Sequence, residues 1–586
     1  MKSVEIRIPL MIQDPLTARI GGIKPTEGFD PDREGFFLDG PITDRIAVLD
    51  FEPETGQLAQ GARFHSPLPG RVRGWYENAQ GVDLYKIKEE SKYYTPEFLQ
   101  VSVFATVLRT MYLFERTDTL GRPLTWAFDA PQLLVVPRAG KQANAYYHRD
   151  SHSLQFFYFD SPIDRGQSIY TCLSRDIVAH ETGHAIIDGL APDLIDASSP
   201  QSLAIHEAIA DLTALLMAFD SHTLRKVVLD RTGGSIEETT EFSSIAEEFG
   251  EATGLRGGLR SLKNDRNLDP ADRENGTVRD EPHELSQVLS GALFSVMIKI
   301  HDDLKAEYAV LPEFAGRPNP IASASGKALS KGAERFKRMV FRALDYLPPG
   351  EASFADYGRA ILAVDLVAYP DNDKMRQWIR SEFVRRSIVP SETSLEIERQ
   401  FESEALPGID VPTLHASDWA AYQFANANRD LLRIPSEIPF HVRPRLLVEK
   451  EYDYHTVARE CIFKVAWELT EPNSIGARYP STRRVTVGTT LAFDWDTGKV
   501  LALLTSAPVD RMKGGPQGIG IDEYLQGRQD RDWFLSRLIN RDLLRIGRHA
   551  IGPGGEPFRE AIQADDLGGV LHLRGTGNSL HMVGQP

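Results

Sequence analysis

Residues 176–188 read DIVAHETGHAIID, and this stretch decides most of what the sequence predicts. His180 and His184 are four residues apart, so on a helix both imidazoles project from one face and can bind one metal ion. Glu181 lies about 100° around the helix from His180, beside the ion rather than on it. We predict that its carboxylate takes a proton from a water at the metal and passes it to the leaving group.

The next helical segment, HEAIADLTALL at residues 206–216, supplies a third ligand. A catalytic zinc ion usually has three protein ligands and an open fourth position, and two His with one Glu is a known set. Glu207 is the predicted third ligand, and Asp211, one turn later, is predicted to accept the second ring N–H of a ligand histidine. His206 points about 100° away from Glu207 on a helix and is predicted to lie outside the site. The two helices together predict a catalytic Zn²⁺ site.

Composition limits the other classes of function. The formal net charge of −17 over 586 residues disfavours nucleic-acid binding, because phosphate contacts need clustered Lys and Arg. The two cysteines, Cys172 and Cys461, are far apart, so the sequence predicts neither a disulfide framework nor a Cys-rich zinc site. The first residues lack the apolar core of a signal peptide, and no apolar run approaches the roughly 20 residues that span a bilayer. We expect a cytoplasmic protein that does not insert into membranes.

The first part of the chain has the pattern of strands. Residues 1–90 are predicted to form a β-rich N-terminal unit, because short strand-like runs alternate with turns rich in Gly and Pro. Residues 91–200 are predicted to form a β-rich lobe. In this lobe a helix begins at Thr95-Pro96, an antiparallel sheet follows it, and the helix of His180 ends the lobe.

The rest of the chain is richer in helical patterns. Residues 201–388 form a predicted helical lobe, and residues 389–586 a C-terminal α+β region of unknown role, with a hairpin at residues 496–498. A sheet followed by helices is typical of the α+β class. Apolar residues recur with the helical period over residues 174–188, 202–219, 283–304, 332–346, 354–367 and 373–386.

The combination of His-Glu-x-x-His at residues 180–184 with Glu-x-x-x-Asp at residues 207–211 resembles the thermolysin-like zinc metallopeptidases. The resemblance covers about residues 97–388. It implies a β-rich lobe and a helical lobe with the zinc cleft between them, and hydrolysis of bonds within peptide or protein substrates.

The resemblance also implies residues that bind substrate. Asn144 and Ala145, in QANAYYHRD, are similar to the edge strand of the family, which pairs with the peptide backbone by strand addition. Ile177 and Leu259 correspond to residues that line the pocket for the side chain after the cut, which implies an apolar preference there.

Two further residues resemble groups that act on the reacting carbonyl. Arg260, in GGLRSLKND, is similar to the family arginine that holds a substrate carbonyl. His283, in DEPHELSQVLSGALFSV, is similar to the histidine that donates a hydrogen bond to the tetrahedral oxyanion.

The sequence departs from the family at two places. No tyrosine lies between His184 and Glu207, where the family has a second oxyanion donor, and losing one such donor costs about 10²-fold in rate. The calcium ligands are incomplete, because Asp176 matches one position but Ala218 stands where another carboxylate belongs. The resemblance therefore does not extend to calcium binding.

Two alternative functions stay open. A gluzincin aminopeptidase would use the same metal ligands, although the sequence shows no motif that binds a free N-terminus. A pseudoprotease or regulatory protein would keep the metal for structure. Glu181 argues against that second alternative, because structural zinc sites are normally closed by four protein ligands. The C-terminal region offers a surface for a regulatory partner.

Overall fold

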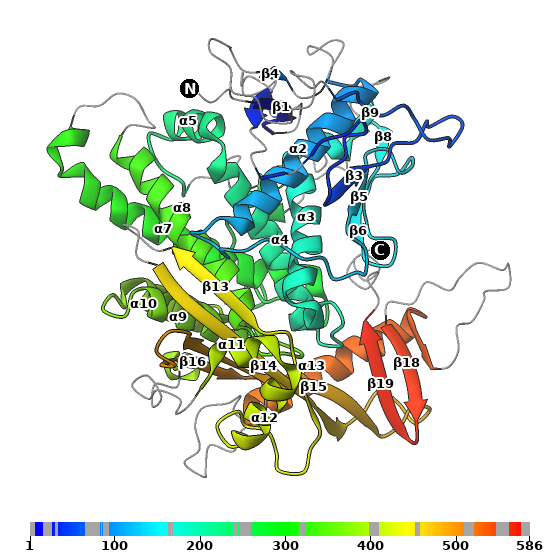
Figure 1. Cartoon of the computed structure of the whole chain (residues 1–586), viewed down its shortest axis with the longest axis vertical. Helices are drawn as coiled ribbons and strands as arrows, with labels where there is room; N and C mark the ends of the chain where they lie inside the picture. Colours follow the sequence, from blue (N-terminus) through cyan, green and yellow to red (C-terminus); the bar gives the residue numbers. More distant parts are fainter. Residues whose placement is uncertain are drawn as a thin grey trace.

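The two helices that carry the predicted ligands lie side by side near the centre of the molecule (Figure 1). The first, α3 (Arg175–Leu190), begins after Ser174, whose side chain accepts a hydrogen bond from the Ile177 N–H. The second, α4 (Pro200–Asp220), has a proline at its first position, where no backbone N–H is needed. The computed structural model describes residues 6–13, 15, 26–29, 33–34, 36–64, 82–83, 85, 93–161, 166, 168–237, 244–245, 260–315, 323–397, 409–451, 457–508, 521–546 and 562–575.

The predicted helical spans are confirmed as helices, with ends that differ by a few residues. The largest difference is at the start of α8, which is capped by Ser323 and begins about two turns before the predicted residue 332. A short helix that follows α4 directly was not predicted, because its sequence HTLRKVVLDR is mainly polar. The other helices of this part are α2 (Pro96–Glu115), α5 (His222–Arg231), α7 (Pro282–Ala309), α8 (Ala324–Tyr346), α9 (Phe354–Ala368) and α10 (Lys374–Arg385).

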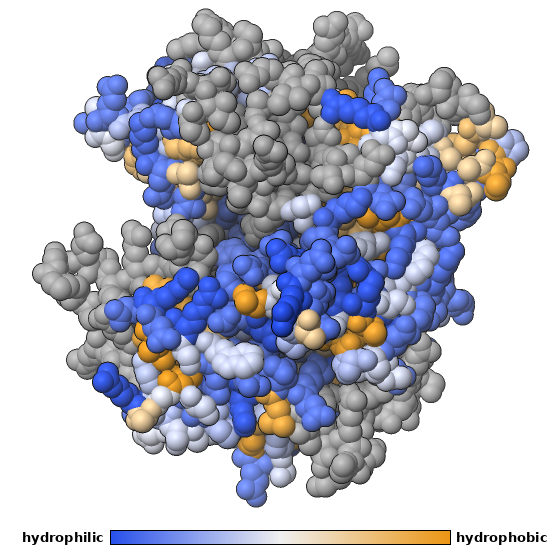
Figure 2. Space-filling view, turned by 180° about the vertical axis from the view of Figure 1, so that it is seen from behind, coloured by the Kyte–Doolittle hydropathy of each residue, from blue (hydrophilic) through white to orange (hydrophobic). Residues whose placement is uncertain are grey.

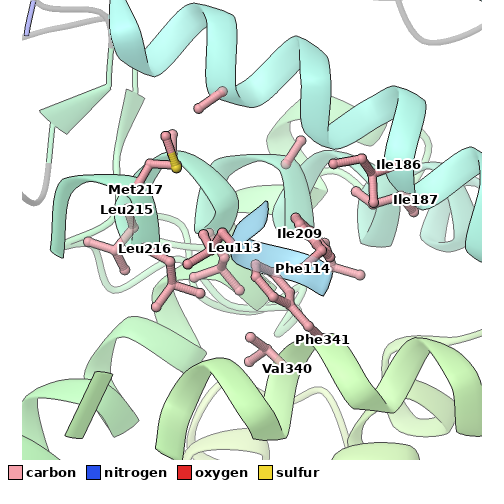
Figure 3. Close-up of a cluster of buried hydrophobic side chains, with 14 of the residues drawn as sticks. Leu113, Phe114, Ile186, Ile187, Ile209, Leu215, Leu216, Met217, Val340 and Phe341 are labelled. Carbon is pink, nitrogen blue, oxygen red and sulfur yellow. The ribbon is translucent and has the colours of Figure 1, made fainter. Parts of the chain in front are cut away.

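Apolar packing among α2, α3, α4 and α8 fixes the two ligand helices in place (Figure 3). Phe114 of α2 stacks on Phe341 of α8 with ring centroids 3.8 Å apart. Every hydrophobic side chain of α4 is buried, and Gly183 of α3 lies close to the backbone of Ala210, so the two helices approach closely. The side chains of the ligands are held on this rigid core.

The helix α4 corrects the expectation that no segment is long and apolar enough to span a bilayer. It meets that criterion by length and composition, although the whole of its most apolar stretch is buried inside the protein. The buried position explains the composition, since a core helix that is covered on all sides is apolar all round.

The antiparallel sheet predicted for residues 91–200 is confirmed only in part, because the structure has both antiparallel and parallel strand pairs there. The four strands have the order β3-β5-β7-β6, and β5 runs parallel to both β3 and β7, while β6 is antiparallel to β7. Composition favours strands without fixing their direction. Here α2 lies in the connection from β3 to β5, and such a crossover permits a parallel pair. The strands are β3 (Ile46–Val48), β5 (Leu133–Val136), β6 (Ala145–His148) and β7 (Ser153–Phe156).

The remaining described strands before the C-terminal region form three small sheets. β1 pairs with β2 and β4 at the N-terminal side, β8 pairs with β9 before α3, and β10 pairs with β11 before α7. Their bounds are β1 (Ile6–Met11), β2 (Thr26–Phe29), β4 (Val82–Asp83), β8 (Tyr158–Asp160), β9 (Ser168–Tyr170), β10 (Ser244–Ile245) and β11 (Arg260–Ser261). The structure therefore contains both helices and sheets, in agreement with the predicted α+β class.

The C-terminal region is built on an eight-stranded sheet with the central order β12-β14-β15-β19-β18-β17. β15 and β16 form the predicted hairpin around Asp496, Thr497 and Gly498. The elements of this region are α11 (Val411–Ala416), α12 (Asp418–Ala427), β12 (Phe440–Val442), β13 (Leu446–Glu451), β14 (Val457–Pro472), β15 (Thr482–Asp494), β16 (Val500–Thr505), α13 (Ile521–Asn540), β17 (Leu544–Ile546), β18 (Ile562–Leu567) and β19 (Val570–Gly575).

This region packs directly on the helices of the candidate site. Phe534, Leu535 and Leu538 of α13 share one buried cluster with Leu203 of α4, which lies one turn before Glu207. Seen from behind, the described surface is mainly hydrophilic, with apolar side chains in small separate groups (Figure 2).

Candidate metal centre

Three side chains from α3 and α4 converge as a metal-binding group. His180 Nε2 and His184 Nε2 are 3.0 Å apart, and the carboxylate of Glu207 lies 3.6 Å from the first and 3.5 Å from the second. Ligands arranged tetrahedrally around zinc at about 2.0–2.1 Å lie about 3.3 Å from one another. All three residues are buried and could hold a metal ion. The donor set and its spacing fit a zinc ion.

Asp211 lies behind His180, on the side away from the other ligands. Its Oδ1 is 2.9 Å from His180 Nδ1, and the Asp211 side chain is 1% exposed. A carboxylate this close to Nδ1 favours the tautomer with the proton on Nδ1, which leaves Nε2 as the ligand atom and raises its basicity. The geometry is the one that the spacing of Glu207 and Asp211 on α4 predicts.

His206 corrects the sequence prediction, which placed it outside the site. Its Nδ1 is 2.7 Å from His184 Nδ1, and the two rings stack with centroids 4.8 Å apart. The offset of about 100° turns the His206 side chain away from Glu207 on α4. It carries no information about which residue of the adjacent helix lies on that side. α3 presents His184, so each ligand histidine has its own partner on α4.

Glu181 is tied to the edge of the sheet. The Tyr147 N–H in β6 donates a hydrogen bond of 3.1 Å to Glu181 Oε2, and the Glu181 side chain is buried. Because β6 ends the strand order of its sheet, this contact connects the candidate base to the strand predicted to bind peptide. The hydroxyl of Tyr147 donates to Asp188 at 2.8 Å, so it is used within the packing of α3.

His283 reaches the site from the start of α7. Its Nε2 is 3.5 Å from Glu207 Oε1, and its side chain is 29% exposed, more than any of the three ligands. Glu281, which the sequence analysis did not identify, caps α7 and lies 3.2 Å from His283 Nδ1. Burial acts to raise the pKa of Glu281, but hydrogen bonds and charge from His283 hold that pKa below its usual value. In the sequence, the position of Glu281 two residues before the candidate histidine could have pointed to this contact.

The structure describes some of the residues predicted to bind substrate more fully than others. Ala145 is the first residue of the edge strand β6, and its N–H donates to the Asn144 side chain at 2.9 Å. Ile177 is buried on α3, one turn before the ligand histidine at 180. Arg260 is described only by its backbone in β11, and Leu259 lies outside the described residues.

Asp176, the residue that matches a calcium position, is engaged elsewhere. It is buried, and its Oδ2 accepts a hydrogen bond of 2.6 Å from the Gln13 side chain. Among the described residues, the groups of three or more side chains close enough to hold an ion do not include Asp176.

Replacing Asp211 with asparagine is expected to lower zinc affinity roughly 10- to 100-fold, because the partner of His180 loses its charge. Competition with a chromophoric chelator measures this affinity. Asp230→Asn, at an exposed position on α5, is the matched control and should leave the affinity unchanged. Equal zinc affinities for the Asp211 variant and the parent would contradict the role given to this carboxylate.

No family model matches the chain, and no curated protein does. A functional assignment therefore depends on the chemistry of this site.

Proposed function

We propose that the protein is a zinc-dependent endopeptidase with a thermolysin-like catalytic unit. The observation that carries this proposal is the buried group of His180, His184 and Glu207, with the buried Glu181 next to His180 in the chain and outside that group. Three protein ligands leave a coordination position for substrate, whereas a structural zinc site normally has four. A bound zinc ion would supply Lewis acidity toward a water molecule and a peptide carbonyl.

The residues around the ligands have distinct proposed roles. Glu181, whose Oε2 accepts the Tyr147 N–H, takes a proton from the attacking water and then passes it to the leaving amine. His283, aligned by Glu281, donates to the developing oxyanion through Nε2. The β6 edge holds the peptide as an added strand next to Glu181, and Arg260 is the proposed second group on the substrate carbonyl.

Activity against an unfolded protein substrate tests the proposal. We expect the purified chain to cut internal peptide bonds, to lose this activity with a chelator, and to regain it with zinc. Mass spectrometry of the products locates each cut. Release of single residues from the N-terminus would favour the aminopeptidase alternative, and the absence of hydrolysis by the zinc-loaded chain would favour a pseudoprotease.

A further inference from the structure

The place of the candidate oxyanion donor depends on how two helices begin. Glu207 lies on α4 and His283 in the first turn of α7, and His283 Nε2 is 3.5 Å from Glu207 Oε1. Glu281, which caps α7 and lies beside His283 Nδ1, belongs to the segment that leads into α7. A shift of this segment relative to α4 would therefore move the histidine away from the ligand group. The helix α13 of the C-terminal region contacts both helix starts.

α13 lies against the first turns of the ligand helix α4 (Figure 1). Apolar side chains of α13 share a buried cluster with Leu203. A polar chain makes a second connection, because Arg531 donates to Glu351 at 2.7 Å and the same carboxylate accepts two hydrogen bonds from Ser198, two residues before α4 begins. The start of the ligand helix is therefore fixed relative to α13.

Two ion pairs connect α13 to the segment before α7. Arg279 Nη1 lies 3.6 Å from Asp530 Oδ2, and Arg279 Nη2 donates to the Leu268 carbonyl at 2.9 Å. Arg537 Nη1 lies 3.5 Å from Asp280 Oδ1. The two residues held in this way, at positions 279 and 280, directly precede the capping residue of α7. α13 therefore supports the backbone that leads to the cap and to the histidine.

The pair of Arg279 and Asp530 is mostly shielded from solvent. Their side chains are 23% and 2% exposed, so the attraction between them is screened less than in a surface ion pair. Burial raises the pKa of Asp530, while Gln526 and Arg279 oppose that shift. Both members of the pair line a cavity of about 850 Å³, so continuous apolar packing does not surround the segment on that side. Loss of the arginine would therefore loosen the turn before α7.

We propose that α13 positions the oxyanion histidine: Arg279, held by Asp530, fixes the turn before α7, and that turn fixes His283 opposite the ligand group. This inference rests on the proposed function and extends it, because it makes the C-terminal region part of the catalytic unit. Arg279 is a positioning residue, which acts through the histidine and does not touch the substrate. A change in the position of α13 would alter the metal centre by the same route.

Binding of a tetrahedral analogue tests the position of the histidine directly. The probe is a blocked peptide phosphonamidate, whose anionic oxygens resemble the hydrated carbonyl, and isothermal titration calorimetry on the zinc-loaded full-length chain gives its affinity. We expect Arg279→Gln to weaken this probe about tenfold and His283→Ala about 10²-fold. A peptide hydroxamate with the same side chains binds the metal ion but presents no tetrahedral oxyanion. Its affinity for Arg279→Gln should stay near that of the parent.

A double-mutant cycle separates positioning from a general effect on the fold. Because Arg279 acts through His283, the double variant Arg279→Gln/His283→Ala should bind the phosphonamidate as the single variant His283→Ala does. Arg273→Gln, at an exposed position in the same connection between β11 and α7, is the matched control and should bind as the parent. Arg537→Gln removes the more exposed ion pair, disturbs the core less, and should give a smaller loss in the same direction.

Two results would overturn the positioning role while leaving the proposed function in place. One is parent-like affinity for the phosphonamidate in Arg279→Gln, or in Arg537→Gln if the first variant does not fold. The other is a further loss of affinity when Arg279→Gln is added to His283→Ala. If the zinc-loaded parent binds neither probe, the proposed peptidase function is rejected, and this inference with it.

Discussion

Replacing Glu181 with glutamine is expected to lower kcat/KM for peptide hydrolysis by about 10²–10⁴-fold while leaving the metal bound. Glutamine keeps the shape of the side chain, and its amide oxygen can still accept the Tyr147 N–H. It cannot accept and return a proton. Because Glu181 lies beside the ligand group and is not part of it, zinc content should stay at the level of the parent.

Two measurements on the same preparation make this prediction specific. Hydrolysis of a quenched fluorescent peptide gives kcat/KM, and elemental analysis gives the metal content. Glu313→Gln, at an exposed site, is the control for the chemical change and should have the activity of the parent. Full activity in the Glu181 variant would reject the proposed mechanism, while loss of both activity and metal would mean that Glu181 supports the metal site.

Glu207→Gln is expected to have the second large effect, a loss of zinc affinity of more than about 100-fold. Removing a partner behind a ligand already costs about 10- to 100-fold, and here the ligand itself loses its charge. The Glu207 side chain is 1% exposed, and its oxygens lie within 3.6 Å of both histidines, so another group cannot easily replace it.

Thermal unfolding reports the same loss independently of activity. Zinc at 100 times its Kd stabilises the folded parent by about 2.7 kcal/mol, and a 100-fold weaker site gains about 0.4 kcal/mol at that concentration. We therefore expect zinc to raise the Tm of the parent and to have little effect on the variant. Glu307→Gln, on the exposed face of α7, is the control. An equal zinc-induced rise in Tm for Glu207→Gln would exclude this carboxylate as a ligand.

In the proposed mechanism the histidine that donates to the oxyanion comes from α7, and Arg260 is the second group on the substrate carbonyl. His283 lies near the ligand group, with Glu281 at its other ring nitrogen. Tyr147, whose N–H donates to Glu181, uses its hydroxyl on Asp188. If His283 acts alone, turnover is expected to be slower than with two donors, by about 10²-fold.

Local sequence alone was enough to predict that His180, His184 and Glu207 form one group that could hold a metal ion. The i, i+4 spacing of His180 and His184, and of Glu207 and Asp211, fixes which side chains share a helical face, because 3.6 residues per turn is a local property of the backbone. The same periodicity located the helices, and the proline at position 96 located the start of α2. Such features depend on neighbours in the chain.

Tertiary structure decided everything that depends on which elements pack together. His206 meets His184 because α3 lies against that face of α4, and Glu181 receives the Tyr147 N–H because β6 lies at the sheet edge. The parallel pairing of β5 with β3 likewise arises between segments that are distant in sequence. Local periodicity carries no information about these neighbours, since packing brings together residues that no spacing rule connects.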